Sequence, residues 1–140
     1  MNNPPLGLVH EATLHIDKTL VVPSLPKALA AMADMPPVFA TAYMVAFVEA
    51  TCIEALAPYL EADEGTVGTQ INMSHVAATP IGMSVTARVE LVTMERRQLL
   101  FRAVCRDAKD LIGEGLHERC VINRPVFMAR TESKLAPAEC

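Results

Sequence analysis

The pattern of apolar residues predicts one long helix in the first half of the chain. Residues 39–57 are apolar almost all round a helical wheel, whereas most surface helices keep one polar face. Pro36 and Pro37 precede this stretch and Pro58 ends it, as expected at the start and the end of a helix. We therefore predict a helix over residues 39–57 that is buried by its surroundings.

A period of two residues replaces the helical period after residue 66. Apolar and polar residues alternate over residues 67–76, 84–92, 98–106 and 111–125, which predicts four strands. Residues 8–16 alternate in the same way and predict a first strand before the helix. The last four strands are joined by short turns, so we expect antiparallel neighbours. The prediction is an α+β fold in which a five-stranded antiparallel sheet wraps one long helix.

The remaining segments are irregular. Residues 17–37 contain four prolines among many apolar side chains, which suggests a functional segment that covers part of the molecule, with a short helix near residues 27–32. Residues 1–8 and 128–140 are expected to be loose ends. At 140 residues the chain is predicted to form a single domain over residues 1–140.

Composition excludes several classes of protein. The net charge is −4 and there is no basic run, which argues against nucleic acid as a partner. No apolar stretch reaches membrane-spanning length without a charge or a proline, and residues 1–8 lack the features of a signal peptide. We therefore expect a cytoplasmic protein. Its four cysteines show no CxxC pairing, and disulfides are not expected in that compartment.

The predicted helix has too much apolar surface for one sheet to cover. An antiparallel sheet can wrap only one side of a helix, whereas this helix is apolar on nearly every side. A second copy of the chain could cover the remaining side. The sequence therefore predicts a homodimer, with a tetramer left open.

Glu49 stands out within the predicted helix. At about 100° per residue, its neighbours on the helix surface are all apolar. A carboxylate in such a stripe is costly unless it has a partner or is kept for chemistry, so it is either a hydrogen-bonded structural residue or a catalytic one. The neighbours are Ala42, Val45, Ala46, Ile53 and Leu56.

Other polar residues have structural as well as functional interpretations. Thr41 is placed to cap the helix N-terminus, and His75, at the end of a predicted strand, could be a hydrogen-bonded structural residue. Thr41 lies eight residues from Glu49, about 12 Å along a helix, so the two side chains could flank one ligand without touching. His117 and Arg119 would by default be solvated strand residues. The sequence shows no metal-ligand spacing, glycine-rich phosphate loop or nucleophile elbow.

Several separated blocks of the sequence closely resemble the fluoroacetyl-CoA thioesterase family, a group of hotdog-fold acyl-CoA thioesterases. The blocks occur in the same order with equal gaps, and the resemblance runs from about residue 21 to residue 122. They include Val38 to Val45, Glu49, Ala57 to Leu60, Glu64-Gly65, Gly68-Thr69, His75 to Pro80, Gly82, Leu111 to Gly113, Gly115 and His117 to Arg119.

This resemblance implies a dimeric hotdog fold, in which two sheets join into one larger sheet. It implies that Thr41, Glu49 and His75 form the catalytic set, and that Gly68 and Arg119 line the acyl or thioester end of the substrate. It further implies an acyl-CoA substrate, with no metal and no cofactor apart from the coenzyme A of the substrate itself.

The sequence departs from the family in the 17–37 segment. The fluoroacetyl-specific enzyme has two phenylalanines there, one of them part of a gate over the acyl pocket, and the matching residues here are Met32 and Met35. Val22 and Leu25 keep an apolar lining. The departure argues against selectivity for the fluoroacetyl group but does not argue against thioester hydrolysis.

The expected reaction is hydrolysis of a short-chain acyl-CoA to free acid and CoA. Glu49 could act as a general base on water or attack the carbonyl directly, and the sequence does not decide between them. His75 would polarise the thioester or protonate the leaving thiolate, and backbone N–H groups at the helix start or near Gly68 could stabilise the oxyanion.

Two other functions compete with thioester hydrolysis. One is a non-catalytic acyl-CoA-binding or regulatory hotdog module, which would not need a buried carboxylate. The other is an acyl-CoA hydratase of the same fold, whose Asp/His pair at a different spacing is not found in this sequence.

Overall fold

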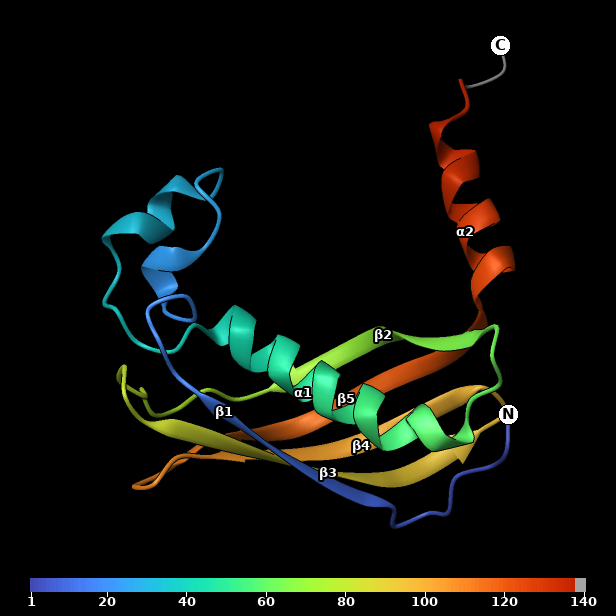
Figure 1. Ribbon diagram of the computed structural model, residues 1–140, viewed down its shortest axis with the longest axis horizontal. Helices are drawn as coiled ribbons and strands as arrows, with labels where there is room; N and C mark the ends of the chain where they lie inside the picture. Colours follow the sequence, from blue (N-terminus) through green and yellow to red (C-terminus); the bar gives the residue numbers. More distant parts are fainter. Residues whose placement is uncertain (138–140) are drawn as a thin grey trace.

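A five-stranded antiparallel sheet curls around one long helix in the computed structural model, which describes residues 1–137 (Figure 1). This confirms the predicted α+β hotdog architecture. The strands are β1 (Val9–His15), β2 (Glu64–Met73), β3 (Ser84–Glu95), β4 (Gln98–Arg106) and β5 (Leu111–Asn123). The helices are α1 (Thr41–Leu56) and α2 (Arg124–Glu132), and short 3-10 turns occur at Val22–Ser24, Ala30–Asp34, Ala57–Tyr59 and Ser133–Leu135.

The strand order is β1-β3-β4-β5-β2, and every pairing is antiparallel. β3, β4 and β5 follow one another through short turns, whereas α1 carries the chain from β1 at one edge to β2 at the other. Within residues 1–137, β2 pairs with β5 on one side only. Its other side is a free edge of the sheet, beside α1.

The core lies between the sheet and one side of α1. The alternate apolar residues of β3 and β4 are all fully buried, and they pack against α1 residues that are equally buried. These side chains are Val85, Ala87, Val89, Leu91, Leu99, Phe101, Ala103 and Cys105 from the strands and Met44, Val48, Cys52 and Leu56 from α1.

The opposite side of α1 is apolar but uncovered in the single chain. Ala42, Ala46 and Ala50 are exposed, and Ile53 keeps 46% of its surface accessible. Together with its following turn, α1 spans 19 residues, Thr41–Tyr59, and by length and composition alone it could cross a membrane. Its position against the sheet is that of the core helix of a globular domain (Figure 1).

The predicted element boundaries differ from the observed ones by up to three residues. α1 begins at Thr41 rather than at residue 39, because Ala40 is extended and Phe39 forms a bridge with Val21. β2 covers Glu64–Met73 instead of residues 67–76, since residues 64–66 pair with the end of β5. β3 continues to Glu95 because a bulge near residue 92 lets the pairing resume beyond it.

The 17–37 segment extends away from the sheet near the start of α1 (Figure 1). It contains two 3-10 turns instead of the predicted helix at residues 27–32, and residues 26–37 are exposed in the single chain. Its large apolar side chains Leu29, Met32 and Met35 are therefore accessible. Within one chain only the start of the segment packs on the core, through buried Val21, whereas residues 26–37 do not cover it, contrary to what the composition suggested.

Part of the predicted C-terminal loose end is helical. The Asn123 side chain accepts a hydrogen bond from the Val126 backbone N–H at 3.1 Å, Pro125 lies in the first turn, and α2 continues to Glu132. Residues 138–140 lie outside the described part of the chain. At the other end, the backbone N–H groups of Asn2 and Gly7 donate to the carbonyls of Tyr59 and Leu91, so residues 1–8 are held against the domain.

Candidate functional site

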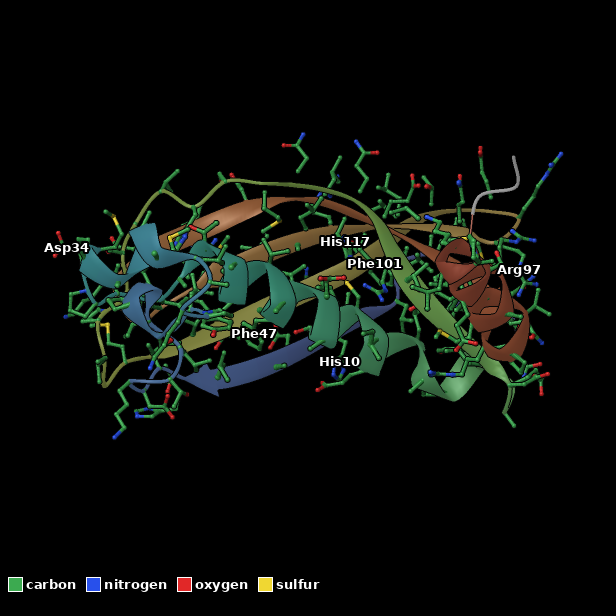
Figure 2. The ribbon with its side chains drawn as sticks, turned by 90° about the horizontal axis from the view of Figure 1, so that it is seen from above. His10, Asp34, Phe47, Arg97, Phe101 and His117 are labelled. Atoms are coloured by element: carbon green, nitrogen blue, oxygen red, sulfur yellow. The ribbon has the colours of Figure 1, made fainter. Side chains whose placement is uncertain are left out.

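A cavity of about 270 Å³ lies between α1 and β2, with the Glu49 carboxylate in its wall. Glu49 enters from the middle of α1, while β2 and β5 supply the other side, where Figure 2 labels His117. Both apolar and polar residues line this space. The lining residues are Val45, Glu49, Gly68, Thr69, Gln70, Ile71 and His117.

Glu49 pairs with a buried arginine. Arg119 Nη1 donates to Glu49 Oε2 at 2.9 Å, and the Arg119 side chain is only 3% exposed while that of Glu49 is 37% exposed. His117 and Arg119 share the inner face of β5 with buried Val121, since alternate strand residues face the same side. The prediction that His117 and Arg119 are solvated was therefore wrong, because both point towards α1.

The buried guanidinium has several hydrogen-bond partners. Arg119 Nε donates to Thr66 Oγ1 at 2.8 Å, and Nη2 donates to the Thr66 carbonyl at 2.9 Å. Nη1 also donates to His117 Nε2 at 3.0 Å. A buried charge requires such compensation, and here it fixes the direction from which Arg119 meets the carboxylate.

Gly68 allows β2 to pass close to the carboxylate. A Cβ atom at this position would lie 2.7 Å from Glu49 Oε2 and 3.1 Å from His117 Cε1. The pairing of β2 with β5 is irregular between Gly68 and Gln70, so the strand bulges beside the cavity. Gly68, Glu49 and Arg119 are thus brought together, as the family resemblance implied.

A second polar pair lies at the start of α1. Thr41 Oγ1 and His75 Nδ1 are hydrogen-bonded at 2.7 Å. The helix cap is Ala40, with no side-chain cap bond, so the predicted capping role of Thr41 was wrong. Thr41 is the first helical residue, and its hydroxyl is directed to the loop that follows β2.

His75 has one ring nitrogen without a partner. Its Nε2 atom is buried and accepts or donates no hydrogen bond within residues 1–137. Burial lowers the pKa of His75, and the backbone of Ala77 opposes this shift more weakly. The Phe39 ring meets the imidazole edge-on, with centroids 6.4 Å apart. A neutral imidazole with an unsatisfied nitrogen is suited to binding a polar ligand atom.

The Thr41–His75 pair borders its own cavity, of about 280 Å³. Val22 is among the residues that line it, whereas Leu25, Met32 and Met35 line neither this cavity nor the one at Glu49. Thr41 and Glu49 are two turns apart on α1, about 12 Å by helical rise. Within one chain the predicted set is therefore divided between two cavities. Across residues 1–137, no group of three His, Cys, Asp or Glu side chains is placed to hold a metal ion.

Comparison with known proteins places this geometry in a family. The profile described as fluoroacetyl-CoA-specific thioesterase matches residues 25–125. The fluoroacetyl-CoA thioesterase of Streptantibioticus cattleyicolor is 47% identical over 102 residues, which cover 73% of each chain. A solved structure of a fluoroacetyl-CoA thioesterase matches with a TM-score of 0.93 and 38% identity, covering 97% of this chain and 100% of the other.

A more distant structure shares the fold. A thioesterase superfamily member from Thermus thermophilus matches with a TM-score of 0.85 at 22% identity, covering 96% of both chains. The match of the family profile and the 47% identity show membership of a sequence family, whereas the more distant structure shows only a shared fold. By both criteria, the chain belongs to the fluoroacetyl-CoA-specific thioesterase family.

Proposed function

We propose that this protein hydrolyses short-chain acyl-CoA thioesters to the free acid and CoA, with Thr41, Glu49 and His75 as its catalytic residues. The observation that carries the proposal is the Glu49 carboxylate, which borders a cavity and has one oxygen held by a buried arginine. Family membership supports the reaction class.

The reaction needs an attack on the thioester carbonyl carbon and stabilisation of the oxyanion that forms. Glu49 either activates a water molecule or attacks directly, and both routes use a carboxylate oxygen that Arg119 does not occupy. Gly68 allows the acyl carbonyl to approach this carboxylate, since no side chain shields it. Water is the second reactant, and we propose no cofactor.

The Thr41–His75 pair supplies the second part of the reaction. When the Thr41 hydroxyl donates to Nδ1, the neutral imidazole carries its proton on Nε2, the atom without a partner. This N–H can donate a hydrogen bond to the carbonyl or to the departing thiolate, and the proton that the thiolate finally takes up comes from water. Thr41 acts here by selecting the tautomer of His75, a role that does not require a contact with Glu49.

We infer that a second copy of the chain brings the two parts together. The free edge of β2 exposes residues 68–72 beside the uncovered apolar face of α1. Antiparallel pairing of two β2 strands about a two-fold axis near Ile71 would place the partner subunit's His75 opposite Gly68. Glu49 of one chain would then face the Thr41–His75 pair of the other.

The acyl group would bind beside this composite site. Val22 already borders the Thr41–His75 cavity, and we propose that Leu25 adds to the apolar lining. Met32 and Met35, exposed in the single chain, would cover the acyl group when the 17–37 segment lies at the dimer interface. These methionines replace the aromatic gate that the family resemblance implies.

The test is steady-state release of free thiol from acetyl-, propionyl- and butyryl-CoA. Glu49→Gln keeps the size of the side chain but removes the charge, so we expect activity to fall by about 10²- to 10⁴-fold. Glu54→Gln on the exposed side of α1 is the matched control and should retain activity. A wild-type protein that binds CoA thioesters without releasing thiol would instead be a binding module, and the proposal would be wrong.

A further inference from the structure

His117 is a buried histidine at the candidate site that the proposed Thr41, Glu49 and His75 set does not use. It is 2% exposed and lies between a backbone carbonyl of β2 and the Arg119 guanidinium. Its Nε2 atom is 4.0 Å from Glu49 Oε2, too far for a hydrogen bond. Its contact with the carboxylate therefore runs through Arg119.

The two hydrogen-bond partners of His117 fix its proton. The Gln70 carbonyl can only accept, so His117 Nδ1, 2.8 Å away, carries a hydrogen and donates it. Arg119 can only donate, so His117 Nε2, 3.0 Å from Nη1, is an unprotonated acceptor. Both bonds are satisfied only by the neutral ring with its proton on Nδ1. Burial and the Arg119 charge lower the pKa of His117, while the Gln70 carbonyl and the Glu49 carboxylate oppose this shift.

The bond to His117 limits how Arg119 can meet Glu49. Nη1 has two hydrogens, of which one goes to Glu49 Oε2 and the other to His117 Nε2. Nε and Nη2 are directed to Thr66. Arginine and a carboxylate often form two parallel hydrogen bonds, one from each of two nitrogens, but within residues 1–137 only Nη1 donates to Glu49, while Nε and Nη2 donate to Thr66. Among residues 1–137, Glu49 is hydrogen-bonded through Oε2 alone, which leaves Oε1 free of hydrogen bonds in a residue that lines the cavity.

We propose that His117 is a positioning residue, a neutral acceptor that holds Arg119 in a single hydrogen bond with Glu49 and so keeps Oε1 available for the reaction. The catalytic consequence rests on the proposed thioester hydrolysis, whereas the hydrogen-bond arrangement does not. A histidine suits this position because it accepts on one nitrogen while donating to the strand backbone with the other. Protonation of His117 Nε2 would turn this acceptor into a donor, and it would then face the Arg119 guanidinium, which can only donate.

The first test determines the protonation state of His117 without measuring enzyme activity. ¹⁵N NMR of histidine-labelled protein should show His117 as the neutral ring protonated on Nδ1, unchanged between about pH 5 and 8, a range in which an ordinary histidine titrates. His117→Gln identifies the signal by its loss. A His117 signal that titrates near the ordinary value of about 6.5 would overturn the proposal.

The second test uses the dependence of kcat/KM on pH. In His117→Leu, Nη1 loses the acceptor that orients it, so the guanidinium can turn until Nη1 and Nη2 each donate to one oxygen of Glu49, which stabilises the charged carboxylate. We expect the acidic limb of the profile to move to lower pH and kcat to fall by about 10- to 100-fold, because the reacting oxygen is occupied. His117→Gln retains an acceptor and should recover the position of the acidic limb.

His10→Leu, the same substitution at a half-buried histidine of β1, is the control and should leave the profile unchanged. A folded His117→Leu protein with the wild-type acidic limb and kcat would overturn the positioning role. If the wild-type protein releases no thiol, the proposed thioester hydrolysis is wrong. The NMR result then tests the hydrogen-bond arrangement of His117 by itself.

Discussion

Gly68 determines how closely the strand β2 approaches the Glu49 carboxylate. In Gly68→Ala the new Cβ would lie 2.7 Å from Glu49 Oε2, and the carboxylate is the end of a flexible side chain that can move aside. We therefore expect a small loss of stability but a fall in kcat/KM of about 10- to 100-fold, since the carboxylate leaves its position at Arg119. Thermal unfolding and thiol release on the same preparation measure the two effects.

Gly113→Ala provides the contrast. A Cβ there would lie 2.1 Å from the Ser74 carbonyl oxygen, which belongs to the backbone and cannot move aside cheaply. We expect this variant to have a lower free energy of unfolding, while the folded fraction keeps its kcat/KM. If Gly68→Ala kept wild-type kcat/KM, the close approach of β2 to Glu49 would have no catalytic importance.

His75 and His117 should make stability depend on pH. Burial lowers the pKa of both, so between their folded values and the unfolded value of about 6.5 the unfolded chain binds more protons. Their contribution is complete above pH about 6.5 and is lost as the pH falls through their folded pKa values. Urea unfolding from about pH 7 to 5 should show a falling free energy of unfolding.

The matched variants separate the two histidines from the rest of the chain. His75→Gln and His117→Gln should each flatten this dependence, whereas the exposed His15→Gln should not. Asp17, Glu64 and Asp107 also have lowered pKa values, but they act in a more acidic range, below about pH 4.5. Identical slopes in all variants would show that neither buried histidine is linked to folding.

At this scale the sequence identified some site residues better than others. Glu49 could be singled out from its apolar neighbours, and Gly68, His75 and Arg119 from the family resemblance. The burial of His117 and Arg119 could not be predicted, because a polar residue in a strand is solvated by default. The inward position of Arg119 becomes favourable through partners distant in the sequence, the Glu49 carboxylate on α1 and Thr66 on β2.

Elements with a strong repeating pattern were predicted well. The strands β3 and β4 have long alternating patterns, and β4 was predicted with its observed bounds, while α1 was predicted from a long apolar stretch between prolines. The helix α2 was not predicted, because it depends on a local cap at Asn123 in a polar stretch without periodicity. The 17–37 segment has no internal period, and its large apolar residues Leu29, Met32 and Met35 are exposed in the single chain.

The 17–37 segment is the element that should set acyl selectivity. Met32 and Met35 are flexible side chains that fill irregular space, so they shape a pocket less strictly than aromatic rings. One methylene in an apolar pocket is worth about 1–3 kcal/mol, or 10- to 200-fold. We expect kcat/KM on acetyl-, propionyl- and butyryl-CoA to differ by less than this, with no large preference for fluoroacetyl-CoA over acetyl-CoA.

The double variant Met32→Phe with Met35→Phe tests the cause of this selectivity. Restoring two rings should widen the differences in kcat/KM among the acyl groups, while Leu29→Phe in the same exposed segment serves as the control. A wild-type preference for fluoroacetyl-CoA of several thousand-fold would contradict the prediction. In that case the aromatic gate could not be the source of selectivity.

The whole molecule in solution should be a dimer, because two features of the single chain need a partner. One is the free edge of β2, and the other is the apolar outer face of α1. Light scattering should give about 30 kDa, twice the chain mass of 15.2 kDa. Ile53→Glu places a charge on that face and should shift the protein towards the monomer. The exposed Val9→Glu on β1 is the control, and a stable wild-type monomer at micromolar concentration would contradict the prediction.

Mixed dimers can show whether each site takes residues from both subunits. Glu49→Gln and His75→Ala chains with different tags are co-expressed, and the mixed dimer is purified by both tags. If Glu49 of one subunit works with the His75 of the other, one site of the mixed dimer carries both substitutions and the second carries none. About half of the wild-type activity per dimer should then return, although each parent is nearly inactive.

If each site were instead built within one subunit, every site in the mixed dimer would carry one substitution and activity would stay at the level of the parents. The separation of about 12 Å between Thr41 and Glu49 along α1 favours the first outcome. Activity no higher than that of either parent, in a purified dimer that carries both tags, would show that the two cavities act within one chain. The divided arrangement seen in the single chain would then require a movement of α1 or of the His75 loop instead of a partner.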